Sequence, residues 1–276
     1  MMFEQTDCAS ADVAARLSAC LDMQTGENLP PLWHWLLFLD PAPASALGPD
    51  GHRASGGPVP LDPDLPARMW AGGNVQFHKP IPIGTILRRA TRVADITERQ
   101  GRSGKLRFVT LQHTIFSNDD LLIEERQNLV YRAAIAPRPQ AAPAHAAPPG
   151  AFLRSITPDE IMLFRFSALT FNAHRIHYDL PYATTVEHYP GLVVHGPLQA
   201  ILLAGHLANA MPEGAVIHHF DYRGLAPAFG GRPLNLEAWP AEAWPNADHP
   251  ATWHLQTRDP AGAICMSAQA KTGHPP

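Results

Sequence analysis

The chain has little charge and few cysteines, and each shortage excludes a class of protein. Charged residues make up 17% of its 276 residues, against roughly 25% in an average globular protein, and the formal net charge is -4. This balance does not provide the basic surface that nucleic-acid binding requires. The three cysteines, Cys8, Cys20 and Cys265, have neither the number nor the spacing of a disulfide framework or a thiolate metal site. We therefore expect no nucleic-acid partner, no disulfide and no metal.

Long hydrophobic runs are also missing. The longest apolar stretches, such as residues 35–39 and 201–204, are far shorter than the 18 or so residues that a membrane span needs. The N-terminal sequence MMFEQTDCASADVAARL contains acidic residues and lacks the positively charged start and apolar core of a secretory signal. The sequence therefore predicts a cytoplasmic protein without membrane contact.

Proline is abundant instead, and its distribution divides the chain. Among the 29 prolines, five fall in the stretch APRPQAAPAHAAPPG at residues 136–150, a composition that favours an extended linker over a packed core. The linker separates two predicted domains, residues 1–135 and 151–276, each of ordinary domain size. A second Pro/Gly-rich stretch, residues 40–66, predicts a long loop inside the first half. A loop of this length is usually a lid or an insertion.

The two halves contain the same sequence features in the same order. PLWHWLL at residues 31–37 resembles PLQAILL at residues 197–203, and proline at the first position favours a helix start. Downstream, Phe77 precedes Pro82 by five residues, as Tyr222 precedes Pro227. This repeat predicts two copies of one unit, each with one buried helix, that pair as a pseudo-dimer with a continuous sheet.

Runs of β-branched and aromatic residues follow each predicted helix, separated by turn sequences such as GRSG, NDD and DPAG. They predict antiparallel meanders packed around a helix, which is an α+β fold. The expected strands are residues 86–96, 106–116 and 121–131 in the first half and residues 234–239, 252–257 and 264–270 in the second.

The densest polar cluster of the chain is FNAHRIHYD at residues 171–179, on a loop that we expect near the surface. Tyr182 and Ala183 follow it, and GLVVHGP at residues 191–197 then leads into the second predicted helix. Histidine can act as a base, and the N–H groups at a helix N-terminus can stabilise an oxyanion. Overlaying the halves on their helices puts residues 6–13 opposite the cluster, and these contain no histidine. The pattern favours acyl chemistry through an enolate, in the second half only.

At these residues the chain resembles the MaoC-like and type 2 hydroxyacyl-thioester dehydratases, which have a double hot-dog fold and act as R-specific enoyl-CoA hydratases. His177, the pair Tyr182-Ala183 and the pair His195-Gly196 match the family's signature, whereas Asn172 stands where the family usually has Asp, and His174 where it has Asn. The variant FNxHRIHYD is similar to the branch that contains mitochondrial type 2 dehydratases and bacterial mesaconyl-C4-CoA and itaconyl-CoA hydratases. The residues Trp33, His34, Trp35 and RMWAGG at 68–73 extend the resemblance into the first half.

The resemblance implies a hydro-lyase that acts reversibly on a short branched or dicarboxylic acyl-CoA, with coenzyme A as part of the substrate, no separate cofactor and an oligomer of identical chains as one option. His177 is the expected acid/base, and Gly196 the expected oxyanion donor. An amide cannot accept a proton as a carboxylate does, so Asn172 is expected to orient water, with Asp179 or His174 assisting. The expected substrate-binding residues are His174, Arg175, Tyr178, Val194, His195, Trp70, Gly72, Gly73, Arg68 and Arg223.

Several alternatives remain at this point. His174, His177 and Asp179 have the chemistry of metal ligands, His177 could be a structural core histidine, and Gly196-Pro197 could be a helix start only. Arg68, Arg175, Arg223 and Lys79 could contact CoA phosphates or a substrate carboxylate, or lie on a solvated surface. The alternative functions are a dehydratase of longer 3-hydroxyacyl thioesters, a thioesterase and an acyl-CoA binding protein without catalysis.

Overall fold

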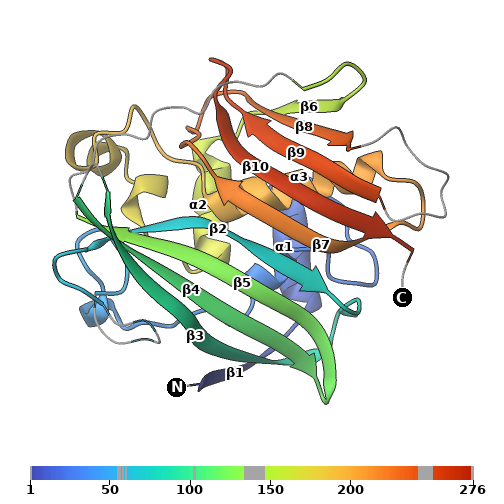
Figure 1. The fold of residues 1–276 in the computed structure, drawn as a ribbon, viewed down its shortest axis with the longest axis horizontal. Helices are drawn as coiled ribbons and strands as arrows, with labels where there is room; N and C mark the ends of the chain where they lie inside the picture. Colours follow the sequence, from blue (N-terminus) through green and yellow to red (C-terminus); the bar gives the residue numbers. More distant parts are fainter. Residues whose placement is uncertain are drawn as a thin grey trace.

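The computed structural model describes residues 2–54, 57, 59, 61–101, 104–133, 147–241 and 251–274, and its central feature is one antiparallel sheet of ten strands (Figure 1). The first half contributes β1 (Met2–Cys8), β2 (Ala67–Phe77), β3 (Ile86–Gly101), β4 (Gly104–Ser117) and β5 (Asp120–Arg132). The second half contributes β6 (Phe152–Ile156), β7 (Val216–Gly224), β8 (Leu234–Pro240), β9 (Ala251–Arg258) and β10 (Ile264–Gly273).

The order of the strands shows that the two halves are copies of one unit. It runs β1-β3-β4-β5-β2-β7-β10-β9-β8-β6, so that each half has the same sequence of neighbours, counted outward from the β2–β7 seam. At the seam Val75 pairs with Phe220, and both are fully buried. The sequence repeat makes Phe77 equivalent to Tyr222, and with the same offset Val75 is equivalent to Phe220. A residue that pairs with its own equivalent is what a pseudo-twofold axis through an antiparallel strand pair produces. The predicted continuous sheet is confirmed.

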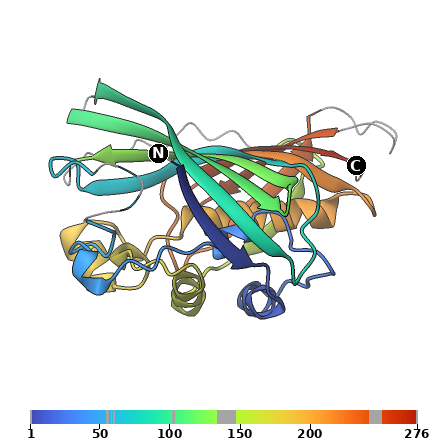
Figure 2. The same ribbon diagram turned by 90° about the horizontal axis from the view of Figure 1, so that it is seen from below.

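The helices lie together on one face of this sheet (Figure 2). They are α1 (Ala11–Leu21), α2 (Glu160–Leu169) and α3 (Gly196–Ala210), joined by the 3-10 turns η1 (Trp33–Leu36), η2 (Ala44–Ala46) and η3 (Arg175–His177) and the π turn η4 (Tyr182–Val186). The side chains of Ser10 and Asp159 cap α1 and α2, and Pro197 stands in the first turn of α3. Most of α3 is buried, which makes it the central helix of the second half.

The prediction of an equivalent buried helix at residues 31–37 is wrong. Only one 3-10 turn forms there, because Leu32 before it and Phe38 after it adopt left-handed backbone with φ of 70° and 56°. Pro41 and Pro43 then prevent extension. Leu32, Trp33, Leu36 and Leu37 are buried all the same, so the pattern predicts their burial correctly and the conformation incorrectly.

The predicted counterpart of the FNAHRIHYD cluster also needs correction. By position in the fold α1 corresponds to α2, so the segment of the first half that matches residues 171–179 follows Leu21 and does not lie at residues 6–13. That segment, DMQTGEN at 22–28, contains no histidine either. The asymmetry between the halves therefore remains.

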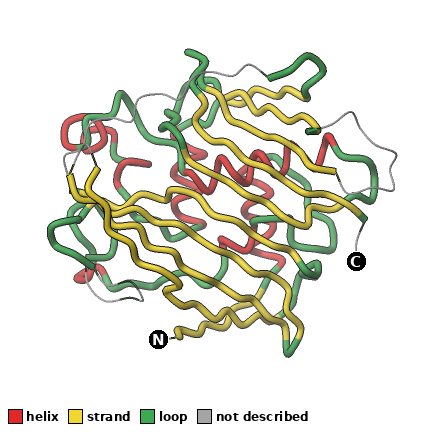
Figure 3. Tube along the Cα trace, viewed as in Figure 1, coloured by secondary structure: helices red, strands yellow, loops and turns green. Residues whose placement is uncertain are grey.

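All six predicted strands are confirmed, and Figure 3 shows how they extend into the turns between them. The predicted long loop at residues 40–66 contains only η2 and an isolated bridge between Leu47 and Arg53 among its described residues. Residues 136–146 of the predicted linker lie outside the described residues. Within the described part of the chain, no helix has the length and apolar character to span a membrane.

Candidate functional site

His177 ends the short turn η3 beneath the N-terminus of α3. Its Nδ1 lies 2.7 Å from the carbonyl oxygen of Val193, and its ring stacks on that of His195 with centroids 3.7 Å apart. A carbonyl can only accept, so Nδ1 carries the hydrogen and Nε2 keeps the lone pair. His177 is 7% exposed, which corrects the expectation of a residue near the surface. The geometry fixes one tautomer, with Nε2 available as a base.

His195 precedes the first residue of α3 and joins that helix to α2. Its Nε2 lies 2.8 Å from Oγ of Ser167, and its other ring nitrogen, Nδ1, is buried without a partner among the described residues. The N–H groups of the first turn of a helix have no intrahelical partners, and the helix dipole makes this end positive. The stacked pair of His177 and His195 therefore lies beside the group of donors that begins at Gly196.

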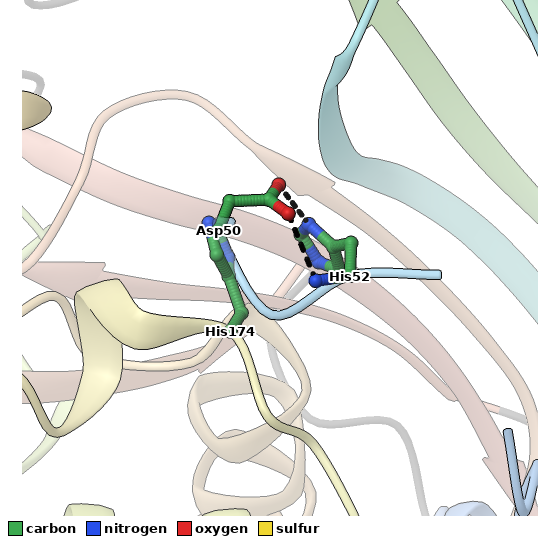
Figure 4. Close-up of side chains that lie close together, drawn as sticks. All are labelled: Asp50, His52 and His174. Atoms are coloured by element: carbon green, nitrogen blue, oxygen red, sulfur yellow. Dashed lines mark hydrogen bonds and ion pairs between the residues drawn. The ribbon is translucent and has the colours of Figure 1, made fainter. Parts of the chain in front are cut away.

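A row of imidazole rings continues from His177 toward the first half. His174 meets His177 edge to face at 5.4 Å between centroids, and the ring of His52 lies 3.9 Å from that of His174. His52 is in turn held by Asp50, whose carboxylate accepts hydrogen bonds from the backbone N and from Nδ1, each at 2.9 Å (Figure 4). The site is thus assembled from both halves of the chain.

Burial keeps these rings neutral. Burial first, with a smaller contribution from the nearby His52 and against the effect of the hydrogen bond to Val193 O, lowers the pKa of His177 to about 4. The pKa values of His174 and His195 fall below the usual range for the same reason, with neighbouring imidazoles adding to the effect. Burial also lowers the pKa of His52, helped by the charge of Arg68 and opposed by Asp50. Strongly perturbed groups gathered in this way are typical of functional sites.

Asp50, His52 and His174 have ligand-type atoms within 4.8 Å of one another, a spacing that a small cation could use. Two observations oppose a metal here. Asp50 and His52 already bond each other directly, and Arg68 places a positive charge near both imidazoles. The donor set therefore fits a hydrogen-bonded pair better than a metal centre. The alternative trio of His174, His177 and Asp179 is not among the clusters that the described residues form.

Asn172 begins the loop that carries these histidines. Its Oδ1 accepts from the backbone N of His174 at 3.0 Å, which closes an Asx turn, and its own N–H donates to Ser167 O at 2.8 Å. The amide therefore shapes the loop that presents His174. Its expected role of orienting water stays a prediction.

We expect Asn172→Ala to lower kcat/KM on the order of tenfold, because the loop loses the turn that orients His174. Asn172→Asp keeps an acceptor for that turn and should retain appreciable activity. A carboxylate on the loop that carries His174 and His177 favours their charged form, so this variant should begin to lose activity on the acid side at a higher pH than wild type. The measurement is kcat/KM against pH for the three proteins. Wild-type behaviour of the alanine variant at every pH would show that the turn is dispensable.

Asp179 is not brought to His177 by any contact that the structure describes. Its Oδ2 accepts from Arg175 Nε and Nη2 at 3.0 and 2.8 Å, and its Oδ1 accepts from the backbone N of Tyr182. Those hydrogen bonds lower the pKa of the Asp179 carboxyl, Tyr182 N first and Arg175 next. Asp179 is thus occupied as a cap and ion-pair partner, which speaks against its predicted assisting role.

Arg175 and Tyr178 also point to structural tasks. Arg175 donates from Nη1 to Pro49 O and from its backbone N to Asp50 O, so it ties the loop of the first half to the site. The hydroxyl of Tyr178 donates to Ala173 O, and its side chain lines a surface hollow of about 390 Å³ with Phe164 and Leu180. Substrate binding by either residue stays a prediction.

Trp70 packs directly against the N-terminus of α3. A Cβ on Gly196 would lie 2.5 Å from Cε3 of Trp70, so the contact itself demands glycine at this position. Trp70 stacks on Tyr222 at 4.4 Å between centroids, and Trp35 meets both rings edge to face at 5.4 Å. Trp70 Nε1 and Tyr222 Oη are buried without a hydrogen-bond partner among the described residues. These aromatic residues fill the space between α3 and the β2–β7 seam.

The two glycines after Trp70 let this cluster form. A Cβ on Gly73 would lie 2.5 Å from Tyr222 Oη, and one on Gly72, whose φ is 158°, would lie 2.5 Å from Tyr222 O. Glu125 on β5 holds Trp35 in place by accepting from its Nε1 at 2.9 Å and bonding His34 Nε2 at 3.1 Å. The glycines therefore serve the packing of Tyr222, and their predicted contact with substrate is untested.

The remaining predicted residues are distributed around this centre. Val194 is buried and bonds Ala228 O, just before His195. Arg68 lies on β2 near His52 and His174, whereas Arg223 is exposed on β7 opposite Gly72. Lys79 pairs with Asp120 at the surface. Among these basic residues, Arg68 is the one whose charge lowers the pKa of His52 and of His174.

Sequence reasoning missed Asp50, His52 and Ser167. The sequence DGH at residues 50–52 carries a weak signal, since an Asp two residues before another polar residue favours an Asx turn. Gly51 has φ of 89°, and a Cβ there would lie 1.8 Å from Ala173 O, which places this loop against the one that carries His174 and His177. Ser167 gives no sequence signal, because only the packing of α2 on α3 brings it to His195.

Comparison with known proteins identifies the family of this chain. Residues 32–230 match the model of the family described as hydroxyacyl-thioester dehydratase type 2. The chain is 44% identical over 276 residues to the mesaconyl-C(4)-CoA hydratase of Chloroflexus aurantiacus, covering 98% of this chain and 94% of that protein. It is 31% identical over 244 residues to the mitochondrial hydroxyacyl-thioester dehydratase type 2 of Schizosaccharomyces pombe, covering 79% and 80%.

Solved structures support the fold. A MaoC-like dehydratase superposes with a TM-score of 0.73 at 12% identity, covering 99% of this chain and 97% of the other. A Mycobacterium tuberculosis protein described as having a double hotdog fold superposes with a TM-score of 0.65 at 15% identity, covering 99% and 95%. The predicted double hot-dog architecture is therefore confirmed.

Proposed function

Because the chain belongs to the hydroxyacyl-thioester dehydratase type 2 family and is a hydro-lyase of acyl thioesters, we propose that its substrate is a short branched or dicarboxylic enoyl-CoA. Mesaconyl-C4-CoA and itaconyl-CoA are the specific candidates, with R configuration at the hydrated carbon. The observation that carries the proposal is the fixed tautomer of His177 beside the N-terminus of α3.

His177 is the acid/base in this proposal. In the hydration direction its Nε2 takes a proton from water while the water oxygen bonds to the β-carbon of the enoyl thioester. The electron pair of the alkene forms a double bond between the α-carbon and the carbonyl carbon, and the carbonyl pair moves onto the thioester oxygen. As this enolate collapses, the α-carbon receives the proton from His177. Because burial keeps the ring neutral near pH 7, the lone pair is available when substrate arrives.

The N-terminus of α3 stabilises the enolate. The thioester oxygen accepts from the N–H of Gly196, at the positive end of a helix that is buried and therefore little screened by water. Pro197, the next residue, has no N–H and fixes the backbone in the helical conformation. The donor is thus set in place before the charge develops.

Trp70 supports the choice of a short acyl group. Its ring touches the first residue of α3, and Tyr222 and Trp35 pack behind it. An acyl chain held with its thioester oxygen at Gly196 meets this aromatic cluster after a few carbons. The two buried donors there, Trp70 Nε1 and Tyr222 Oη, are suited to oxygen atoms at the distal end of a dicarboxylic acyl group.

The test is incubation of the purified protein with crotonyl-CoA, mesaconyl-C4-CoA, itaconyl-CoA and 2-octenoyl-CoA, following the loss of enoyl absorbance. We expect turnover of the four- and five-carbon substrates at a kcat/KM well above that for 2-octenoyl-CoA, without release of free thiol. Preference for the eight-carbon substrate would favour a long-chain dehydratase. Thiol release would identify a thioesterase, and binding without turnover an acyl-CoA binding protein.

A further inference from the structure

We infer that Asp50 and His52, which lie on the long loop of the first half, are positioning residues of the catalytic site: Asp50 orients His52, whose ring holds His174 against His177. This inference rests on the proposed function, because it assigns these residues a role in the reaction at His177. It also explains why a catalytic site in the second half depends on a segment about 120 positions earlier in the chain.

Asp50 and His52 are joined by two hydrogen bonds. The two oxygens of one carboxylate accept from the backbone N and the ring Nδ1 of the same histidine, both at 2.9 Å (Figure 4). A histidine held in this way has a fixed side-chain rotamer and a fixed tautomer, with its hydrogen on Nδ1. The side chains of His52 and Asp50 are 12% and 20% exposed, so the pair is largely withdrawn from solvent.

This pair contacts the loop that carries His174 and His177. The rings of His52 and His174 are 3.9 Å apart with an interplanar angle of 38°, and His174 meets His177 at 5.4 Å and 89°. The backbone reinforces the placement, since Arg175 N donates to Asp50 O at 2.9 Å. Displacement of His52 therefore moves His174 and removes one of the supports of the His177 ring.

The charged groups around the row of imidazoles also support the role of Asp50. The charged and titratable groups around this row are Asp50 and His52 from the loop, Arg68 from β2, His174 and His177 from the catalytic loop and His195 from the start of α3. The carboxylates in this region are Asp50 and Glu187; Asp50 bonds His52, whereas Glu187 accepts from Tyr182 Oη at 3.5 Å. Asn172 is an amide, and Asp179 is bound to Arg175. Asp50 thus supplies a carboxylate that bonds the imidazole of His52. It makes no hydrogen bond to His177 that the structure describes, so Nε2 of His177 keeps its lone pair.

The experiment compares Asp50→Asn and His52→Phe with wild type in crotonyl-CoA hydration. The amide keeps an acceptor for the backbone of His52, and phenylalanine keeps a ring against His174 while losing the bond to Asp50. We expect each variant to lower kcat about 10- to 100-fold with KM nearly unchanged, as misplacement of a catalytic group does. Asp62→Asn is the matched control, because Asp62 is on the same loop but pairs with Arg107. It should behave as wild type.

Coupling to His177 separates positioning from a general structural role. In a His177→Gln background, Asp50→Asn should cause no further loss, because the group that it positions is gone. The inference is overturned if Asp50→Asn and His52→Phe retain wild-type kcat, or if Asp50→Asn lowers the residual activity of His177→Gln by the same factor. It is also overturned if chelator abolishes wild-type activity and zinc restores it, since the cluster would then be a metal site.

The same measurements distinguish failure of the positioning role from failure of the proposed function. Wild-type protein that hydrates crotonyl-CoA while the variants match it disproves the positioning role alone. Wild-type protein that hydrates no enoyl-CoA disproves the proposed function, and the positioning role with it.

Discussion

Replacement of His177 by glutamine is expected to lower kcat for enoyl-CoA hydration by about 10²- to 10⁴-fold, the contribution of general acid/base catalysis. Glutamine can still donate to Val193 O, so the loop keeps its main anchor. Alanine at this position should give the same loss of activity with a larger loss of stability, because His177 is buried among His174 and His195.

The matched control is His206→Gln. His206 is also buried, also bonds a backbone carbonyl, Phe152 O at 3.0 Å, and lies on α3 away from its N-terminus. We expect a comparable change in thermal stability and unchanged kcat. Because the pKa of His177 is lowered to about 4, wild-type kcat/KM should also stay level as pH falls through 6.5, where an exposed histidine would titrate. A His177→Gln variant with near-normal turnover would remove His177 from the mechanism.

Shortening Trp70 to leucine is expected to change which acyl groups react. Its ring stands between Gly196 and Tyr222, so removing it opens space at the distal end of the proposed acyl site. One methylene in an apolar pocket is worth about 10- to 200-fold in discrimination. The ratio of kcat/KM for 2-octenoyl-CoA to that for crotonyl-CoA should therefore rise on the order of 100-fold.

A loss of packing elsewhere should not have this effect. Trp253, on β9, is 1% exposed and packs against Phe152, so Trp253→Leu removes a similar volume from the core without touching α3's first residue. We expect Trp253→Leu to lower the melting temperature and leave the ratio unchanged. An unchanged ratio in Trp70→Leu would show that the acyl chain does not run toward this cluster.

The sheet could be predicted because its signals are local. Strands β3 to β5 and β8 to β10 alternate with turn sequences, so their number and order follow from neighbouring residues alone. Strands β1, β2, β6 and β7 carry weaker patterns, and for β2 the sequence predicts only substrate contacts of Arg68, Trp70, Gly72 and Gly73. The conformation of residues 31–37 could not be predicted, since a largely apolar run looks alike in a buried helix and in a 3-10 turn whose His34 and Trp35 bond Glu125.

The site likewise contains residues with a local sequence signal and residues without one. His177, His195 and Gly196 could be predicted because they share one stretch of chain and a recognisable spacing. Asp179 is close to His177 in sequence, but it lies four residues after Arg175, and its carboxylate accepts from that guanidinium instead. Asp50 and His52 could not be predicted, because the contact with His174 depends on how two halves pack across a seam rather than on any local pattern.

The buried histidines also determine how the molecule responds to acid. In the unfolded chain an imidazole binds a proton near pH 6.5, whereas burial holds the pKa of His177 and of His113, on β4, at about 4 in the folded chain. Between these values the unfolded state binds more protons, so each such ring lowers the free energy of unfolding by up to about 3 kcal/mol as pH falls. Cooperative unfolding below pH 6.5, and not gradual protonation of the proposed base His177, should therefore set the lower pH limit at which this enzyme works.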